Sequence, residues 1–283
     1  RSRGLGDVYK RQFHYNSDMS ISALLNINQL SARKAAAELE FAVKKVHSLH
    51  PAKGGASGYL DAIRKRVESL AIEEIKKFYP EDNFLGSEIG SEINNSNITW
   101  LINAIDGEVN FISGFPHFAV SVCSLIDEIP ATAVIIDPIR REEFSASKGS
   151  GSNLNNNKIR VSNKSSISQA ILSYHNSSKT DQSNNYQFDK TFDELKNQDV
   201  FMRHTGSAAL DLCYVATGRL DGIWMNGVNQ IDIAAGTLVA QESGALISDF
   251  SGNPKYLNAN HCICSTPKCY KSILKSIKPH FKD

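Results

Sequence analysis

Apolar residues recur every three or four positions in two long segments near the start of the chain. The segments 31–48 and 61–78 both show this spacing, and Ser31 and Pro80 stand where a helix N-cap and a helix stop are expected. We therefore predict two amphipathic helices. Their apolar faces hold Ala35, Leu39, Ala42, Val43 and Val46 in the first helix, and Ile63, Val67, Leu70, Ala71 and Ile75 in the second.

Short apolar and β-branched runs then replace the helical spacing, and each has the length of a strand. A polar loop at 94–97 separates the first two, and the stretch 149–157 is rich in Gly, Ser and Asn, which predicts a turn-rich connection. The predicted strands are Asn83–Leu85, Trp100–Asn103, Phe118–Leu125, Ala131–Asp137 and Glu143–Ser147.

Strand and helix patterns alternate after Ser168, with no internal repeat. This alternation is typical of a mixed α/β protein. The predicted elements are a strand at Ala170–Tyr174, a helix at Gln187–Lys196, a further strand, a helix at Ala208–Thr217, a strand at Gly222–Trp224, a helix at Ile233–Glu242 and a strand at Ala245–Asp249.

Length and charge narrow the class of protein. The 283 residues, 41% hydrophobic and 22% charged, can bury a sizeable core in one large domain or two subdomains. The net charge of +1 gives no electrostatic footprint for autonomous binding of DNA or RNA. No stretch approaches the roughly 20 consecutive apolar residues that span a bilayer, so we expect a soluble protein without membrane association.

The cysteines and the first residues need separate interpretation. Five cysteines in a large chain favour reduced thiols in the cytosol over a disulfide framework. Cys262, Cys264 and Cys269 resemble a metal clip, but alternation on a strand explains the first two, and no second pair completes a zinc site. Residues 1–12 show no helical periodicity, and we expect a non-native or a short disordered, basic extension.

An acidic turn follows the buried strand at Trp100–Asn103 and reads Asn-Ala-Ile-Asp-Gly-Glu-Val-Asn-Phe over 103–111. Asp-Gly by itself is an ordinary turn dipeptide. Further stretches downstream, however, indicate that this turn belongs to a functional site. The stretches at 116–122, 137–140, 143–149, 205–211, 216–222, 232–236 and 241–245 follow in collinear order. Together they resemble the inositol monophosphatase family, whose motif is Asp-Pro-(Ile/Leu)-Asp-Gly-Thr-(Thr)-Asn-Phe, and are especially similar to its bacterial SuhB-type branch.

The resemblance implies a layered αβαβα sandwich and magnesium-dependent hydrolysis of a phosphomonoester, usually inositol monophosphate. Several converging carboxylates would hold two or three Mg²⁺ ions that screen the phosphate and activate water. It also implies an N-terminal α+β subdomain at 13–165 that carries most metal-site positions, and a C-terminal α/β subdomain at 166–283 that carries Asp232. Retained positions are Asp106, the backbone carbonyl of Ile105, and Asp232, which in the family binds metal and approaches the substrate.

Several family positions are changed in this chain. Gly86-Ser87-Glu88 replaces Gly-Glu-Glu, so Ser87 stands at a metal-ligand position and only Glu88 remains as a ligand. Asn103 replaces the aspartate that bridges two metals in the family. Each change removes a full negative charge, so we expect weak or absent magnesium binding. Asn103 could instead merely cap a strand.

Changes also fall on the positions for water and substrate. Glu108 stands where the family has a threonine that positions the attacking water, and Arg64 stands where it has the aspartate that partners this threonine. Gly58 and Asp61 replace two further family residues, while Lys53 is kept. Among the substrate positions, Met225 replaces a glutamate that contacts a sugar hydroxyl, whereas Gly107, Gly206, Ser207, Ala208 and Asp232 keep the family pattern.

The two coupled changes predict a contact. We expect Arg64 to lie within salt-bridge reach of Glu108 or Asp106 and to substitute its fixed positive charge for a missing cation. A solvated position on the helix surface is the plain alternative for an isolated arginine. An unpaired Glu108 with Arg64 in solvent would contradict the prediction.

Two functions follow from the resemblance. The first is a family member whose hydrolysis is lost or strongly weakened and which serves as a scaffold, with a homodimer and a cytosolic protein partner implied by SuhB-type relatives. The second is a working magnesium-dependent phosphatase with a site rearranged around Glu88, Asp106, Glu108 and Asp232. The second hypothesis predicts a small phosphomonoester as the ligand, whereas the first needs no small-molecule ligand.

Overall fold

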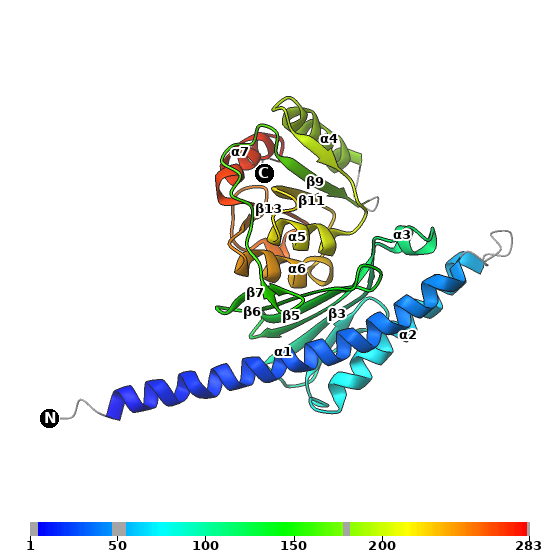
Figure 1. The fold of residues 1–283 in the computed structure, drawn as a ribbon, viewed down its shortest axis with the longest axis vertical. Coiled ribbons are helices and arrows are strands. Elements are labelled where there is room, and N and C mark those ends of the chain that lie inside the picture. The colour runs from blue at the N-terminus through cyan, green and yellow to red at the C-terminus, as the bar shows by residue number, and fades with distance from the viewer. Residues whose placement is uncertain (1–4, 47–54, 178–181, 282–283) are drawn as a thin grey trace.

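Two long helices form the first layer of the computed structural model, which describes residues 5–46, 55–177 and 182–281 and, of their side chains, those of 21–46, 57–177 and 186–281. Helix α1 spans Leu5–Val46 and helix α2 spans Gly55–Lys76. Both lie across one face of a large sheet (Figure 1). Both predicted helices are therefore present, and the retained Lys53 lies outside the described residues.

The predicted start of the first helix is wrong. Ser31 is fully buried in the middle of α1, and its hydroxyl donates to the backbone oxygen of Asn28 instead of capping a helix. Leu24 and Ile27 are also buried, so the apolar face continues toward the N-terminus through Ser31. Residues 5–12, for which the sequence showed no helical periodicity, belong to the first turns of α1.

The first sheet has eight strands in the order β2-β1-β3-β4-β5-β6-β7-β8. Strand β3 pairs with β1 in parallel, and the other pairings along the sheet are antiparallel. The strands are β1 (Asn83–Gly86), β2 (Gly90–Glu92), β3 (Ile98–Asp106), β4 (Ala119–Ile126), β5 (Ile129–Asp137), β6 (Glu142–Ser147), β7 (Gly151–Leu154) and β8 (Asn157–Lys158).

The predicted turn-rich connection at 149–157 is wrong in part, because it contains strand β7 and the start of β8. Asn155 and Asn156 both adopt left-handed backbone angles, with φ of 47° and 66°. Two consecutive residues with such angles make a tight turn that joins antiparallel strands. Asparagine tolerates these backbone angles better than most residues. The segment is therefore a hairpin at the edge of the sheet.

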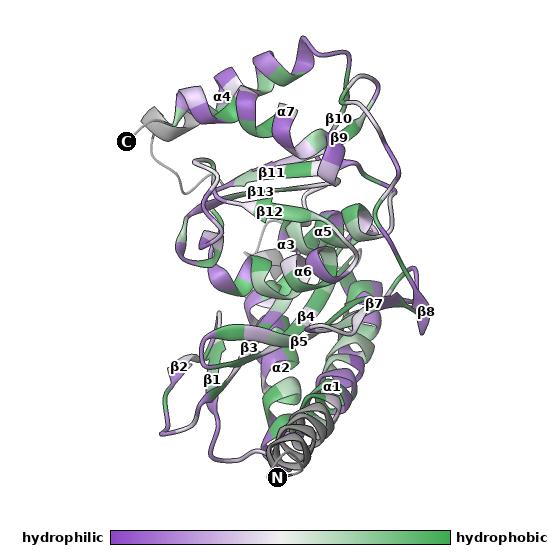
Figure 2. Ribbon diagram, turned by 90° about the vertical axis from the view of Figure 1, so that its left-hand side faces the viewer, coloured by the Kyte–Doolittle hydropathy of each residue, from purple (hydrophilic) through white to green (hydrophobic). Residues whose placement is uncertain are grey.

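The second half of the chain builds a five-stranded sheet in the order β10-β9-β11-β13-β12. Helices α5 and α6 lie between the two sheets, while α4 and α7 cover the far face of the second sheet (Figures 1 and 2). These elements are β9 (Ile171–Asn176), α4 (Gln182–Lys196), β10 (Phe201–Arg203), α5 (Ala208–Ala216), β11 (Gly222–Asn226), α6 (Gln230–Glu242), β12 (Leu246–Ser248), β13 (His261–Ser265) and α7 (Pro267–Ile277). Short elements complete the fold: helix α3 (Glu108–Ile112) and 3₁₀ helices at Tyr256–Asn258 and Lys278–His280.

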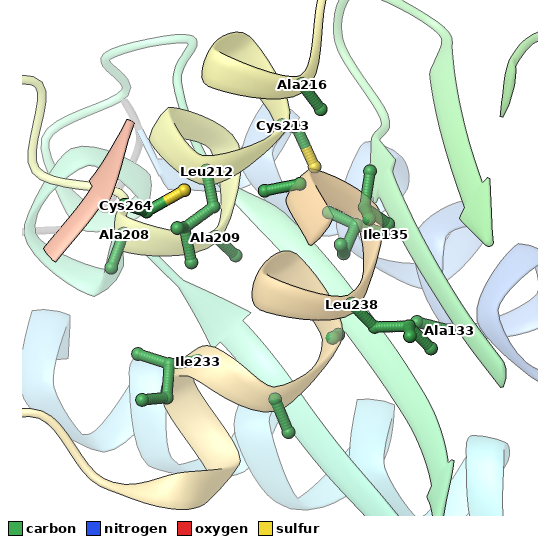
Figure 3. Packing of buried hydrophobic residues seen from close by; sticks show 14 of the residues in the cluster. Ala133, Ile135, Ala208, Ala209, Leu212, Cys213, Ala216, Ile233, Leu238 and Cys264 are labelled. Atoms are coloured by element: carbon green, nitrogen blue, oxygen red, sulfur yellow. The ribbon is translucent and has the colours of Figure 1, made fainter. Parts of the chain in front are cut away.

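The predicted αβαβα sandwich is confirmed, and each of its interfaces has an apolar core. The central core packs α5 and α6 between the sheets and includes Ala209, Leu212, Ile233 and Leu238 (Figure 3). Cys262 and Cys264 lie on β13, as the strand interpretation predicted, and all five cysteines are buried and free. The first sheet occupies residues 83–158 and the second 171–265, so the predicted subdomain boundary at 165 falls in their connection.

Candidate functional site

The acidic turn lies at the end of β3, between the two halves of the sandwich. Strand β3 is buried from Trp100 onward, and its pairing with β4 shifts between Asn103 and Asp106. Gly107 follows with φ of 88°, and a Cβ there would lie 2.9 Å from the backbone oxygen of His117. Only glycine fits this approach without strain, and the turn it permits directs Asp106 inward and starts helix α3 at Glu108.

Arg64 on α2 reaches the same place and binds two carboxylates. Its Nη1 lies 2.9 Å from Oε1 of Glu108, which confirms the predicted ion pair, and its Nη2 lies 2.5 Å from Oε1 of Glu88. Asp61, one turn earlier, lies 3.8 Å away. Burial opposes the arginine charge, but Glu108 and Glu88 outweigh it, so the pKa of Arg64 is raised. The guanidinium therefore carries a permanent positive charge between carboxylates from three segments.

The side chain of Glu88 is 8% exposed and that of Glu108 is 41% exposed. The pair with Glu88 is accordingly shielded from water. An ion pair in such an environment is stronger than one at the surface, because the effective dielectric is lower. Glu88 was predicted as the remaining metal ligand of its motif. In the structure one of its carboxylate oxygens lies against Arg64, and its role as a metal ligand stays a prediction.

Glu68 supports this arrangement and was not found from the sequence. The residue is fully buried on α2, and its carboxylate accepts the backbone N–H groups of Glu88, at 3.1 and 3.2 Å, and Ile89, at 2.6 Å. The hydroxyl of Ser87 lies 3.4 Å from the same carboxylate. A carboxylate one helical turn after Arg64 shares its face of the helix, which is the only sequence signal that points to it.

Asp106 is fixed by the first turn of helix α5. Its Oδ2 accepts the hydroxyl of Ser207, the N-cap of α5, and the backbone N–H of Ala209 at 3.0 Å. Burial, together with the nearby charge of Asp232, raises the pKa of Asp106 to about 7, against the effect of the two hydrogen bonds. The carboxylate therefore joins the first sheet to the second half of the chain.

The remaining predicted positions surround this junction in different environments. Gly206 has φ of 85° and lies against Asn110, whose side-chain amide donates to the backbone oxygens of Thr205 and His117. Asp232 lies in the first turn of α6 and accepts the backbone N–H of Asn229 in a capping box. Asn103, Ile105, Ala208 and Met225 are all buried, and Met225 belongs to the central apolar core.

These residues do not fit a magnesium site as they are arranged. Within the described ranges, no group of three or more His, Cys, Asp or Glu side chains is placed to hold a metal ion. Glu88 is paired with Arg64, Asp106 binds the start of α5, and Asp232 completes a helix cap. Asn103, near the end of the strand that carries Asp106, supplies no negative charge. A divalent ion would have to displace the guanidinium to reach Glu88 and Glu108.

Fold and motif together identify the class of protein. The chain belongs to the inositol monophosphatase family, whose model matches residues 20–281. It is 36% identical over 264 residues to the Nus factor SuhB of Pseudomonas aeruginosa, covering 91% of this chain and 96% of that protein. It is 33% identical over 265 residues to the Nus factor SuhB of Escherichia coli K12, covering 92% and 97%.

Solved structures show the same fold. The extragenic suppressor protein SuhB from Bartonella henselae superposes with a TM-score of 0.81 at 26% identity, covering 90% of this chain and 99% of that one. The inositol monophosphatase from Anabaena superposes with a TM-score of 0.79 at 27% identity, covering 92% and 97%. In the part of the chain that the structure describes, none of the helices has the length and apolar composition to cross a membrane.

Proposed function

We propose that this chain is an inositol-monophosphatase-family protein in which hydrolysis is lost or strongly weakened, leaving a folded scaffold for ligand, subunit or regulatory contacts. The observation that carries the proposal is the ion cluster of Arg64 with Glu88 and Glu108. In this interpretation the guanidinium takes the place of a metal ion. It neutralises the two carboxylates but cannot activate a water molecule as a divalent ion does.

Charge arithmetic supports weak metal binding. A carboxylate and a divalent ion 4 Å apart attract by about 8 kcal/mol at an effective dielectric of about 20. If desolvation leaves a quarter of this, about 2 kcal/mol, each lost carboxylate lowers metal affinity more than tenfold. Ser87 and Asn103 remove two carboxylates and Glu108 adds one, but Arg64 pairs with Glu108 and adds a positive charge that repels the ion.

Phosphate release from inositol 1-phosphate, measured across a magnesium titration, tests the proposal. The comparison is between the wild-type chain and the variant Ser87→Glu/Asn103→Asp/Glu108→Thr/Arg64→Asp, which restores the family residues. We expect the restored variant to release phosphate more than about tenfold faster. Wild-type turnover within about tenfold of it would reject the proposal.

A second measurement covers the case in which the fourfold variant does not fold. Manganese binding, followed by electron paramagnetic resonance, is compared between the wild-type chain and Arg64→Ala. Removing the guanidinium frees Glu88 and Glu108, so we expect tighter manganese binding in the variant. Equal and tight binding by both proteins would contradict the metal-substitution role of Arg64.

A working magnesium-dependent phosphatase with a rearranged site is the second candidate. The observation in its favour is that Asp106 and Asp232 are retained and lie close enough for Asp232 to raise the pKa of Asp106. A metal ion between them would relieve that repulsion. In that case Glu88 and Glu108 would leave Arg64 when magnesium and a phosphomonoester bind.

The relatives suggest the kind of contacts that the scaffold makes. The similar proteins from Pseudomonas aeruginosa and Escherichia coli carry the name Nus factor SuhB, so we propose a protein partner in the cytoplasm and a homodimer. Size-exclusion chromatography with light scattering tests the dimer, and a monomer at micromolar concentration would contradict it.

A further inference from the structure

One segment of this nearly neutral chain is strongly basic. Residues 144–180 contain no aspartate or glutamate, although the whole chain has a net charge of only +1. Lys148, Lys158, Arg160 and Lys164 lie in the described part of this segment. The net charge therefore does not reveal this positive segment, which shows only in the distribution of charged residues along the sequence.

The fold places Lys148 in the turn before β7, Lys158 on β8 and Arg160 two residues beyond β8. Strand β8 is the last strand of the first sheet and is exposed, and it projects at a hydrophilic edge of the molecule (Figure 2). Lys158 Nζ and Arg160 Nη1 lie 3.1 and 3.6 Å from the position that a Cβ on Gly151 would occupy. Two positive charges thus meet at one glycine.

Neither cation is neutralised by a carboxylate. Lys158 donates to the backbone oxygen of Ser150, and Arg160 donates to that of Ile159 at 3.0 Å. No carboxylate of the described residues forms a salt bridge with either. The carboxylate of Glu242, which packs against the same hairpin, accepts the backbone N–H groups of Gly149 and Gly151, both at 2.8 Å. The hairpin therefore presents unpaired positive charge.

A groove of about 670 Å³ adjoins the hairpin at Glu242. Two lysines, Lys148 and Lys255, line it together with two carboxylates, Glu128 and Glu242, so its lining is of mixed charge. Neither lysine forms a salt bridge with the described residues. Its apolar lining includes Leu125, Leu238 and Ile129, of which Ile129 is 51% exposed. An exposed isoleucine in a concave surface is an anchor point for an apolar side chain.

We propose that the β7–β8 hairpin and this groove bind an acidic, extended segment of a partner protein. Carboxylates of the segment pair with Lys158 and Arg160, and one apolar side chain packs on Ile129. The exposed edge of β8 offers backbone groups for strand addition. The proposal rests on the partner-binding role proposed above but not on the loss of hydrolysis.

An acidic peptide fits this surface better than a nucleic acid does. Residues 145–173 contain no Phe, Tyr, Trp or His, so the cationic segment has no platform on which bases can stack. The net charge of +1 also provides no long-range field for a polyanion. A short acidic segment needs only the local charge and a place for one apolar side chain.

The test uses the full chain and a fluorescein-labelled peptide of roughly 12 residues, rich in Asp and Glu around a central Leu-Phe pair. A matched peptide has Asn and Gln in place of Asp and Glu. Fluorescence anisotropy compares the wild-type chain with Lys158→Glu/Arg160→Glu. The control is Lys271→Glu/Lys275→Glu, which changes the net charge equally at two exposed lysines of α7.

We expect the acidic peptide to bind the wild-type chain and the amide peptide to bind at least tenfold more weakly. The hairpin variant should weaken acidic-peptide binding about tenfold or more, and the α7 control less than about twofold. Ile129→Ser should weaken binding of both peptides, because it removes the apolar anchor.

Three results would overturn the proposal. These are no binding of the acidic peptide to the wild-type chain, equal losses in the hairpin and α7 variants, or tight binding of single-stranded RNA at the hairpin without binding of the peptide. Phosphate release measured on the same variants separates this proposal from the functional one. A hairpin variant that loses peptide binding with unchanged phosphate release supports the docking site whatever the hydrolytic activity.

Discussion

Nη2 of Arg64 lies 2.5 Å from the carboxylate of Glu88, an ion pair that joins helix α2 to the turn after strand β1. The same guanidinium holds Glu108 at the start of α3. One side chain therefore connects three segments that the motif brings to one site.

Arg64→Ala should lower the free energy of unfolding by about 2 kcal/mol, because it leaves the nearly buried Glu88 without its positive partner. Urea denaturation measures the change. Arg33→Ala is the matched control, since Arg33 forms a two-pronged pair with Glu143 but its side chain is 53% exposed. The control should lose less than about 1 kcal/mol, and equal losses would contradict the special weight of the Arg64 cluster.

Gly86→Ala should destabilise the protein by about 1–3 kcal/mol through overpacking. The new Cβ would lie 2.5 Å from the carboxyl carbon of Glu68, which is fully buried. Glu68→Ala should also destabilise it, because the backbone N–H groups of Glu88 and Ile89 lose their acceptor. In the double variant the added methyl group has room. The sum of the two single-variant losses should therefore exceed the loss measured for the double variant. Strict additivity in a double-mutant cycle would show that the two residues do not interact.

Ser207→Ala should lower the free energy of unfolding by about 1–2 kcal/mol, because it removes a helix N-cap. It also removes a hydrogen bond to the buried carboxylate of Asp106, and this bond lowers the pKa of Asp106. The pKa of Asp106 should therefore rise in the variant, as NMR titration of the side-chain carboxyl carbon can show. An unchanged pKa would mean that Ser207 acts on α5 alone.

Asp211 gives a pH-dependent prediction. Burial raises its pKa to about 7, although the hydroxyl of Ser173 donates to it at 2.5 Å. In the unfolded chain the pKa of an aspartate is about 3.9. The folded state therefore favours the protonated form, so this group's contribution to stability is fully present below pH 4 and is lost as pH rises to about 7.

Asp211→Asn removes this titration while it keeps the size of the side chain. Relative to the variant, the wild-type protein should lose a few kcal/mol of stability between pH 4 and pH 8. Thermal or urea unfolding at several pH values measures the difference. A constant difference across this range would show that Asp211 titrates near its ordinary pKa.

The mixed α/β class is readable from local sequence, because alternation and helical spacing record which side chains are buried. Helix α2, strands β3 to β6 and helices α5 and α6 follow these local patterns. The ion pair of Arg64 with Glu108 was also predictable, because both residues are changed at positions that interact in the family. Such paired changes carry information about contact without any coordinates.

Other features depend on neighbours far away in the chain and become visible only in the folded protein. Ser31 lies inside α1 because a sheet face formed by later residues buries the whole stripe through it. Glu68 and Glu88 acquire their roles only when α2 packs beside the turn after β1, so neither partner is visible in local sequence. Local patterns report the burial of a residue, whereas the identity of its contacts depends on how elements far apart in the chain pack together.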